Sequence, residues 1–417
     1  PFILFLSEIP RNSKTVIKKI VNPVYELEIK KDRFKKISKF EIYKKNKTDN
    51  LLILSKYDGD KMQSVVEIID LNTFKILHKY LPNFDKINQV TVNKNLNRFK
   101  FLTKDNYQQR YFITHPFVEE DGSIIFQSDS PLVKLNICGK IEWINDDFIF
   151  HHSIEKDLKG NYVTPIQFDP SNINKKYIGD KENQFIDHGI GIINKEGKTI
   201  YAKSLFDIFL TNDLEYQLFG INEFFYKSPF HLNDIQPALT KSKYWEKDDL
   251  FLSLRHKSMI LIYRPSKNKV IKILNGPFLN QHDVDIISDN EISIFNNNSK
   301  NVNNTNNNTY LIETNSEIIK YNFELNKYEK KFNNHLKEIN FKTATQGLHK
   351  ILDDGTIFLE ETNSGRLVML DKNGKLIWQY VNRSDNNKAY KIKWSRIISD
   401  KNKIANLKKS IKLKKCN

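Results

Sequence analysis

The chain has 417 residues, of which 39% are hydrophobic and 12% aromatic, a composition that excludes an intrinsically disordered protein. The formal net charge is +16, but the basic residues gather mainly in the first 50 and the last 17 positions, without zinc-finger spacing, an aromatic RNP motif or a basic-helix pattern. We therefore expect a solvated basic surface and no nucleic-acid partner. The two cysteines, Cys138 and Cys416, give no reason to expect a structural disulfide.

Three segments follow one another along the chain. Residues 1–48 form a basic lead-in whose apolar run, Phe2 to Leu6, is too short to span a membrane by itself and leaves open an anchor upstream of residue 1. Residues 49–400 have the pattern of β-strands throughout, with 203–226 as the clearest helical exception. Residues 401–417 form a basic C-terminal tail.

A recurring hairpin in the middle segment joins two strand-like runs through a turn of the form Asp/Asn-x-x-Gly-Lys. The glycine accepts a positive φ, and the aromatic residue after the turn packs toward a neighbouring sheet. The clearest copies are Leu370–Tyr380, Leu135–Trp143 and Ile193–Tyr201. Such repeats are typical of a β-propeller. We predict an all-β fold, a propeller with six blades of four antiparallel strands preceded by the short basic lead-in.

Histidines recur at the start of five extended segments, each followed by an acidic or amide turn and a second strand. These histidines are His115, the pair His151 and His152, His231, His282 and His349. A repeat that delivers a histidine to the same point gathers imidazoles around one axis, as in the central channel of a propeller. His188 lies where a further blade fits. The histidines outside this layout are expected at the surface: His78, His256 and His335.

Polar residues near two of these histidines indicate an anion site. His231 and Asn233 project from one face of a strand, because residues i and i+2 point together. Arg255 ends the next strand, and its planar guanidinium suits an oxyanion such as sulfate, phosphate or carboxylate. The rival interpretation is a metal bound by the histidine cluster. Arginine beside the imidazoles disfavours a dication, although Asp283 and Glu155 leave carboxylate ligands open.

Several motifs in a fixed order carry a family resemblance: FHHSIEKDLKGN, PFHLNDIQP, DLFLSLR, NQHDVDIISDNEISIF and GLHKILDDGTIFLEETNSGRLVMLDKNGKLIWQYVNR. From residue 51 to residue 396 the chain resembles the PAPS-independent arylsulfotransferase family. The resemblance implies a six-bladed propeller that moves a sulfuryl group from an aryl sulfate ester to a phenolic acceptor through a sulfated histidine. It also implies no cofactor, no metal, only small-molecule partners, and a periplasmic enzyme or one anchored to the membrane and facing the periplasm.

The resemblance also suggests roles for particular residues. His282, in the QHD motif, matches the histidine that becomes sulfated. The residues that match binders of the sulfuryl oxygens are His152, His231, Asn233 and Arg255. A neutral imidazole can attack sulfur directly, and donors around it stabilise the charge that develops on the sulfuryl oxygens.

Further roles concern the histidines around His282. His151 is a candidate for substrate binding, because the HHSI motif fits the family with a shift of one residue. His152 or His231 is the candidate for protonating the leaving phenolate and later deprotonating the acceptor. The resemblance gives no role to His115 or His349.

Two further functional classes stay open on the sequence alone. One is a non-catalytic propeller that binds a sulfated ligand or a protein partner, since propellers are common binding platforms. The other is a metal-dependent enzyme that uses the histidine cluster.

Overall fold

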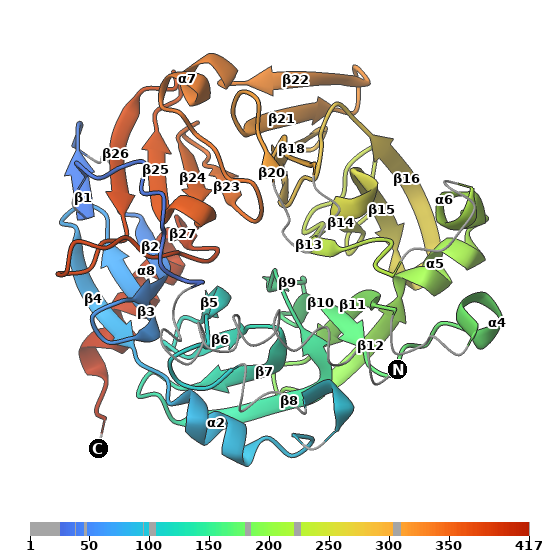
Figure 1. Cartoon of the computed structure of the whole chain (residues 1–417), viewed down its shortest axis with the longest axis horizontal. Coiled ribbons are helices and arrows are strands. Elements are labelled where there is room, and N and C mark those ends of the chain that lie inside the picture. The colour runs from blue at the N-terminus through green and yellow to red at the C-terminus, as the bar shows by residue number, and fades with distance from the viewer. Residues whose placement is uncertain are drawn as a thin grey trace, which may run out of the picture.

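In the computed structural model, antiparallel sheets follow one another around a ring (Figure 1). The residues that the structure describes are 26–37, 39–45, 48–94, 96–99, 106–179, 185–220, 227–302 and 310–416. The ring is a β-propeller, which confirms the all-β class predicted from the sequence.

Four sheets are separate blades, whose strands are named below in the order in which they lie side by side. The first contains β27 (Arg396–Ile398), β2 (Leu51–Asp58), β3 (Gln63–Asp70) and β4 (Lys75–Tyr80). The second contains β13 (Leu232–Pro237), β14 (Leu250–Leu254), β15 (Met259–Arg264) and β16 (Lys269–Asn275). The third contains β17 (Val284–Ile286), β18 (Glu291–Asn296), β21 (Glu317–Asn322) and β22 (Lys327–Lys331). The fourth contains β23 (Leu348–Ile351), β24 (Ile357–Glu361), β25 (Arg366–Leu370), β26 (Leu376–Val381) and β1 (Lys39–Ile42).

A fifth large sheet has eight strands. They are β5 (Thr114–Val118), β6 (Ile124–Gln127), β7 (Ser130–Leu135), β8 (Ile141–Phe150), β10 (Tyr162–Phe168), β11 (Asp187–Ile193) and β12 (Thr199–Ser204), with β9 (Glu155–Lys156) beside β10. The prediction of six blades is therefore wrong: four separate blades form from the described residues. The reason lies in β8, a strand of 10 residues whose C-terminal end also pairs with β10, at Phe150 with Ile166 and at Ile149 with Gln167.

Both ends of the described chain close the ring. Strand β27, near the C-terminus, pairs with β2, for example at Ile398 with Leu51. Strand β1, within the predicted lead-in, pairs with β26 at Lys39 with Val381. The blades at the junction are thus built from both halves of the sequence, which fixes the ring as one unit.

Helices are short and lie outside the sheets. They are α2 (Phe84–Val90), α4 (Lys175–Ile178), α5 (Leu205–Thr211), α6 (Glu215–Phe219), α7 (Asn333–Glu338) and α8 (Lys401–Leu413), with 3-10 turns at Asn97–Phe99, Arg255–Lys257, Pro265–Lys267 and Thr362–Ser364. Helices α5 and α6 fall in the segment 203–226 predicted as helical, of which 221–226 lies outside the described residues. No helix in the described part of the chain is long and apolar enough to cross a membrane.

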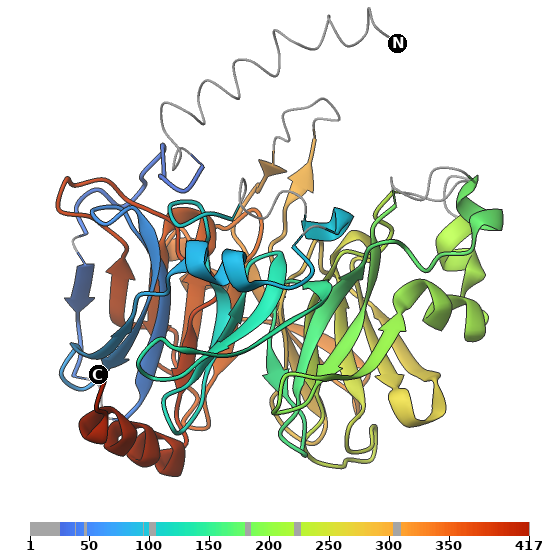
Figure 2. The ribbon, with the colours of Figure 1, turned by 90° about the horizontal axis from the view of Figure 1, so that it is seen from below.

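Helix α8 forms most of the basic tail and lies at the end of the ring opposite the small hairpin of β19 (Lys300–Asn301) and β20 (Tyr310–Leu311) (Figure 2). Its Ile404 and Leu407 are buried against the core that includes Leu51 and Phe126. The side chain of Asp400 caps the helix by accepting hydrogen bonds from the backbone N–H groups of residues 402 and 403.

A disulfide joins Cys138 to Cys416, with 5.4 Å between their Cα atoms, although the sequence alone offers no reason to expect it. Cys138 lies in the turn between β7 and β8, and Cys416 follows α8. The two residues are 278 positions apart in sequence, and only the closure of the ring brings them together.

Candidate active site

The propeller places the ends of certain strands at one end of the ring. In an antiparallel blade, the start of the first strand lies beside the end of the second. The pairing of Leu232 with Leu254 accordingly sets His231, just before β13, next to Arg255, just after β14, and the N–H of Arg255 donates to the His231 carbonyl at 3.1 Å. In the next blade the N–H of His282 donates to the Phe295 carbonyl at 3.0 Å. Residues distant in sequence meet at this end for that reason.

At the start of several of these first strands, or a few residues before it, the backbone turns through a left-handed residue. The positive φ values are 45° at His115, 59° at His152, 50° at His231, 55° at Asn280, 58° at Gln346 and 56° at Trp394. A non-glycine residue with positive φ is strained, and such strain persists where the surrounding structure holds it. His115, His152 and His231 share this position, whereas His282 lies two residues after Asn280 and His349 three residues after Gln346. The predicted equivalence of all the repeat histidines is therefore wrong for these last two.

Three of the predicted histidines converge. The ring centroid of His152 lies 5.4 Å from that of His231 and 6.3 Å from that of His282. His256 stacks on His231 at 4.6 Å, and Nη1 of Arg255 lies 3.2 Å from Nε2 of His256. His256 was expected at the surface, and although its side chain is exposed, it belongs to this group.

The adjacent pair divides into two positions. His152 faces the other imidazoles, while His151 is buried behind it and its Nδ1 lies 2.8 Å from Nδ1 of His152. On its other side, Nε2 of His151 lies 3.2 Å from Nδ1 of His188. His188 is also buried, and its Nε2 has no hydrogen-bond partner. The ring centroid of His188 lies 5.7 Å from that of His231, so the chain of imidazoles returns to the site.

His282 is buried and held at both ring nitrogens. Its Nδ1 lies 2.6 Å from Oδ1 of Asn297 and 3.3 Å from the Asn280 carbonyl. Its Nε2 accepts a hydrogen bond from the backbone N–H of Gln346 at 2.8 Å. These partners define a ring with its proton on Nδ1 and its lone pair on Nε2.

Asn233 supports the segment that carries His282. Its Nδ2 donates to the Gln281 carbonyl at 3.2 Å, and its Oδ1 is buried without a partner. The side chain is fully buried, so in this structure it contacts the backbone beside His282.

The imidazoles of the site are neutral at neutral pH. Burial, and then the charge of Arg255, lower the pKa of His282 to about 3. Burial, together with neighbouring histidines, holds the pKa values of His152, His231 and His188 well below the usual range. A neutral imidazole can act as a nucleophile or as a hydrogen-bond donor, whereas Arg255 keeps its charge.

Trp394 joins the histidines on the side of the first blade. Its ring centroid lies 5.2 Å from His115, 5.9 Å from His152 and 6.4 Å from His282. The indole is fully buried, and its Nε1 has no hydrogen-bond partner.

A second layer of polar side chains contains His115 and His349, the two histidines to which the family resemblance gives no role. His349 Nδ1 lies 2.7 Å from Oδ2 of Asp283, and its Nε2 lies 2.7 Å from Oγ of Ser293. Nη1 of Arg396 donates to Glu155 at 3.0 Å, and its Nη2 lies 3.1 Å from Nδ1 of His115. Both histidines are thus tied to buried polar networks.

The same layer contains the metal-ligand types that the sequence left open. Oxygen and nitrogen atoms of Asp283, Asp285 and His349 lie within 4.8 Å of one another, in the described part of the chain. Lys350 already forms an ion pair with Asp285 at 2.5 Å, and both nitrogens of His349 have partners. The internal cation and the engaged nitrogens of His349 disfavour a metal in this group, although Oδ2 of Asp285 is buried without a hydrogen-bond partner.

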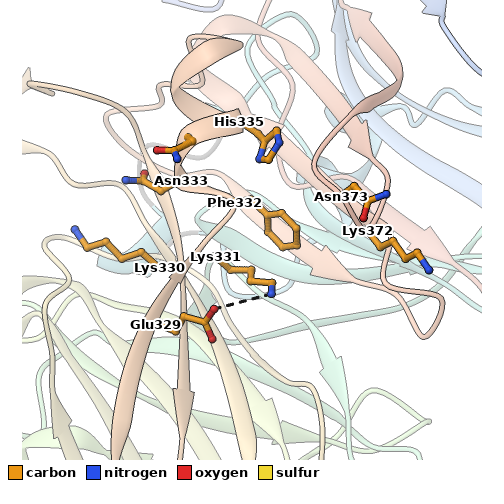
Figure 3. A pocket seen from close by; sticks show the side chains of 9 residues that line it. Glu329, Lys330, Lys331, Phe332, Asn333, His335, Lys372 and Asn373 are labelled. Carbon is orange, nitrogen blue, oxygen red and sulfur yellow. Dashed lines mark ion pairs between the residues drawn. The ribbon is translucent and has the colours of Figure 1, made fainter.

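A depression lies on the outer surface, away from the histidines and carboxylates described above. It has a volume of about 530 Å³ between β22, α7 and the turn before β26, and Lys330, Lys331 and Lys372 line it (Figure 3). None of the predicted site residues lines this depression.

The fold and the site together define a β-propeller with a group of neutral imidazoles and one guanidinium at one end of its ring. The family model described as Arylsulfotransferase (ASST) matches residues 117–383. Because this match spans more than half of the chain, the chain belongs to the arylsulfotransferase family. A search of curated proteins found no significant match.

Solved structures with similar folds are distant in sequence. A protein of unknown function from Bacteroides caccae is 13% identical with a TM-score of 0.50, over 84% of this chain and 99% of that one. TolB from Acinetobacter baumannii is 8% identical with a TM-score of 0.45, over 85% and 68% of the two chains. The WD40 β-propeller domain of Doa1 is 10% identical with a TM-score of 0.41, over 85% and 91%. The similarity to the Bacteroides caccae protein concerns the fold alone. The other two structures are too dissimilar to support a conclusion about this protein.

Sequence reasoning missed several residues of the site. They are His188, His256, Trp394, Asn297 and Gln346. Asn297 lies in an asparagine-rich run that resembles a polar loop, and its position after β18 was the available signal. His256 directly follows Arg255, so its proximity to the site could have been inferred from the arginine.

Proposed function

We propose that this protein transfers a sulfuryl group from an aryl sulfate ester to a phenolic acceptor, and that His282 carries the group between the two half-reactions. The observation that supports this proposal is the state of the His282 ring. Its pKa is lowered to about 3, and its Nδ1 lies 2.6 Å from the Asn297 carboxamide oxygen, which leaves a neutral ring with the lone pair on Nε2. Such a nitrogen is a nucleophile over the whole neutral range of pH.

The first half-reaction forms a bond between Nε2 of His282 and the sulfur atom. The bond between sulfur and the aryl oxygen breaks, and the oxygen leaves with the electron pair as a phenolate that takes up a proton. Positive charge develops on the imidazole and is stabilised by Oδ1 of Asn297, 2.6 Å from Nδ1. The N–H of Gln346 lies 2.8 Å from Nε2, so this hydrogen bond breaks before the nitrogen attacks.

The second half-reaction reverses these steps with a new oxygen. The phenolic acceptor loses its proton, its oxygen attacks the same sulfur, and the nitrogen–sulfur bond breaks with its electron pair returning to Nε2. A ping-pong sequence follows, in which an aryl sulfate takes the place of a nucleotide donor.

Arg255 is the proposed donor to the sulfuryl oxygens. The residue is 7% exposed, and its Nε is buried without a hydrogen-bond partner. A charged, planar donor fits an oxyanion with several oxygens and stabilises the charge that grows in the transition state. His231 and His152, whose rings are 5.4 Å apart, add N–H donors, and Asn233 fixes the backbone beside the nucleophile.

Protonation of the leaving phenolate requires that the pKa of His152 or His231 rises when the substrate binds. Burial and nearby histidines lower the pKa values of both residues, so both are neutral in the free protein. The negative charge of a bound sulfate ester raises the pKa of a neighbouring imidazole. The acid form is therefore generated when the donor binds.

Turnover of a chromogenic aryl sulfate with a phenol acceptor tests the proposal. We expect release of phenolate by the wild-type protein and its loss in His282→Ala, with His335→Ala as a matched control outside the site. Equal, slow release by the wild type and His282→Ala contradicts the proposal.

A non-catalytic propeller that binds a sulfated ligand is the second candidate. The observation that favours it is the hydrogen bond from Gln346 to Nε2 of His282, which occupies the lone pair that catalysis needs. This candidate requires retention of an aryl sulfate without turnover, and an affinity that His282→Ala leaves unchanged. Calorimetric titration with a slowly hydrolysed aryl sulfate separates the two.

The disulfide supports a location outside the reducing cytosol. Disulfides such as Cys138–Cys416 form and persist in oxidising compartments. We propose that the protein functions in the periplasm or on that side of a membrane. Thiol labelling of whole cells before lysis checks this: the two cysteines should be protected from alkylation until a reductant is added.

A further inference from the structure

We propose that Asn297 is a positioning residue that fixes the tautomer of His282, with the proton on Nδ1 and the lone pair on Nε2. The inference rests on the proposed function for its catalytic consequence, but its structural content concerns the imidazole alone. Asn297 follows β18 in the asparagine-rich run and is fully buried.

The orientation of the Asn297 carboxamide follows from its partners. One end of the amide lies 2.9 Å from the Thr343 carbonyl and 2.7 Å from the Gln346 carbonyl. Two carbonyls can be satisfied only by an NH₂ group, because a carbonyl oxygen cannot donate. The other end must therefore be Oδ1, and it lies 2.6 Å from Nδ1 of His282. An oxygen that only accepts requires a proton on Nδ1.

The other ring nitrogen agrees with this assignment. The N–H of Gln346 lies 2.8 Å from Nε2 of His282, and an N–H donor requires a lone pair there. Asn297 also holds the residue that supplies this N–H, since its Nδ2 donates to the Gln346 carbonyl at 2.7 Å. One carboxamide thus sets both sides of the imidazole.

The Asn297 segment is held rigidly enough for this role. Oγ of Ser316 donates to the Asn297 carbonyl at 3.1 Å and accepts from the Thr343 N–H at 3.1 Å. Without the Asn297 acceptor, only the carbonyl of Asn280, at the longer distance of 3.3 Å, faces Nδ1. Loss of the Asn297 Nδ2 also frees the Gln346 carbonyl, so the Gln346 segment can move and its N–H no longer requires a lone pair on Nε2. The proton can then move to Nε2, where it blocks attack on sulfur. Loss of the correct histidine tautomer lowers kcat by as much as about 10⁴ in a serine protease.

Nitrogen NMR on protein with ¹⁵N-labelled histidine tests the tautomer directly and without any substrate. The His282 signals are assigned by their loss in His282→Ala. We expect the wild type to show Nδ1 protonated and Nε2 unprotonated between pH 6 and pH 8. A wild-type His282 with its proton on Nε2 overturns the proposal whatever the variants do.

Two variants and a matched control test whether the tautomer of His282 affects catalysis. Asn297→Ala removes the acceptor, and we expect a mixed or reversed tautomer and a fall in kcat of at least tenfold with little change in KM. Asn297→Asp keeps an acceptor at Nδ1, so we expect the wild-type tautomer and a higher pKa for His282, visible as an acid limb of the rate profile moved to higher pH. Asn298→Gly is the control, because the Asn298 side chain donates to the Asn315 carbonyl at 3.2 Å and its φ of 52° suits glycine.

The outcomes separate this inference from the proposed function. If Asn297→Ala retains both the wild-type tautomer and the wild-type kcat, Asn297 does not position His282. If the wild type shows the expected tautomer but transfers no sulfuryl group, the proposed function fails while the tautomer assignment stands. If Asn297→Ala does not fold, the wild-type spectrum and Asn297→Asp still decide the question.

Discussion

Individual side chains at the site perform distinct tasks that their surroundings explain. Arg255 is buried beside His256. Burial lowers the pKa of His282 most, and the positive charge of Arg255 lowers it further because it disfavours protonation of the imidazole. The planar, charged guanidinium of Arg255 can also donate hydrogen bonds to the several oxygens of a sulfuryl group, as proposed above.

Arg255→Gln should therefore have two effects. Loss of the charged donors should lower kcat by about 10²–10³. The pKa of His282 should rise from its value of about 3, so the acid side of the kcat profile should move to higher pH. Lys257→Gln removes a charge from the same turn without touching the imidazoles and serves as control. A kcat profile in Arg255→Gln that matches the wild type in height and position contradicts both roles.

Motif recognition and structure agree on some of the individual residues only. The sequence motifs pointed to His282, His152, His231 and Arg255, because each lies within a short motif of this chain, and the fold brings them together. Asn297 could not be singled out in the same way. Its role depends on two backbone carbonyls and a ring nitrogen that meet only in the folded blade.

Among the elements, the loop before β23 links a strained backbone position to His282, the proposed nucleophile. Gly347 has a φ of 93°, and a Cβ there would lie 2.7 Å from Cγ2 of Thr343 and 2.8 Å from the ring of Phe295. The preceding residue, Gln346, supplies the N–H that contacts His282. Any substitution at Gly347 must therefore move the loop that contacts the site.

Gly347→Ala should lower the free energy of unfolding by about 1–3 kcal/mol, since it combines crowding with an unfavourable φ. It should also lower kcat, because Gln346 and its contact with Asn297 shift. Gly139→Ala is the matched control: Gly139 has a φ of 78° but no atom within 4 Å of an added Cβ. Urea titration and turnover measured together check the prediction. Equal effects of the two substitutions on kcat contradict the link between this loop and the site.

The elements themselves were largely predictable. Each hairpin has its own turn signature and alternating strands, so strands and turns follow from local chemistry. The number of separate blades could not be predicted from local sequence. It depends on whether the end of one strand also pairs with a strand of the next sheet. Phe150 and Ile149 of β8 make that pairing with β10, and nothing in their local sequence distinguishes this from an ordinary strand end.

In the molecule as a whole, closure of the ring depends on both ends of the chain. Strand β1 completes the blade of β26, strand β27 completes the blade of β2, and the Cys138–Cys416 disulfide fastens the segment after α8 to the turn between β7 and β8. The disulfide was not predictable from two cysteines so far apart in sequence. Their proximity is a property of the closed ring.

Cys416→Ser should destabilise the protein by about 2–5 kcal/mol, because a cross-link restricts the unfolded chain. Its kcat should stay at the wild-type value, since α8 lies at the opposite end of the ring from the β19–β20 hairpin (Figure 2). In that hairpin the ring centroid of Tyr310 lies 5.8 Å from Cζ of Arg255. Thermal unfolding with and without a reductant checks this. A melting temperature that is the same for wild type and variant, and unaffected by the reductant, contradicts the stabilising role.

Whether His282 carries the sulfuryl group can be read directly by mass spectrometry of the protein. The wild type is mixed with an aryl sulfate in the absence of acceptor, quenched, and digested. We predict a single sulfuryl adduct on the peptide that contains His282, which disappears when a phenol is added and never forms in His282→Ala. No adduct on the wild type while phenolate is released, or an adduct that forms equally in His282→Ala, contradicts this role of His282.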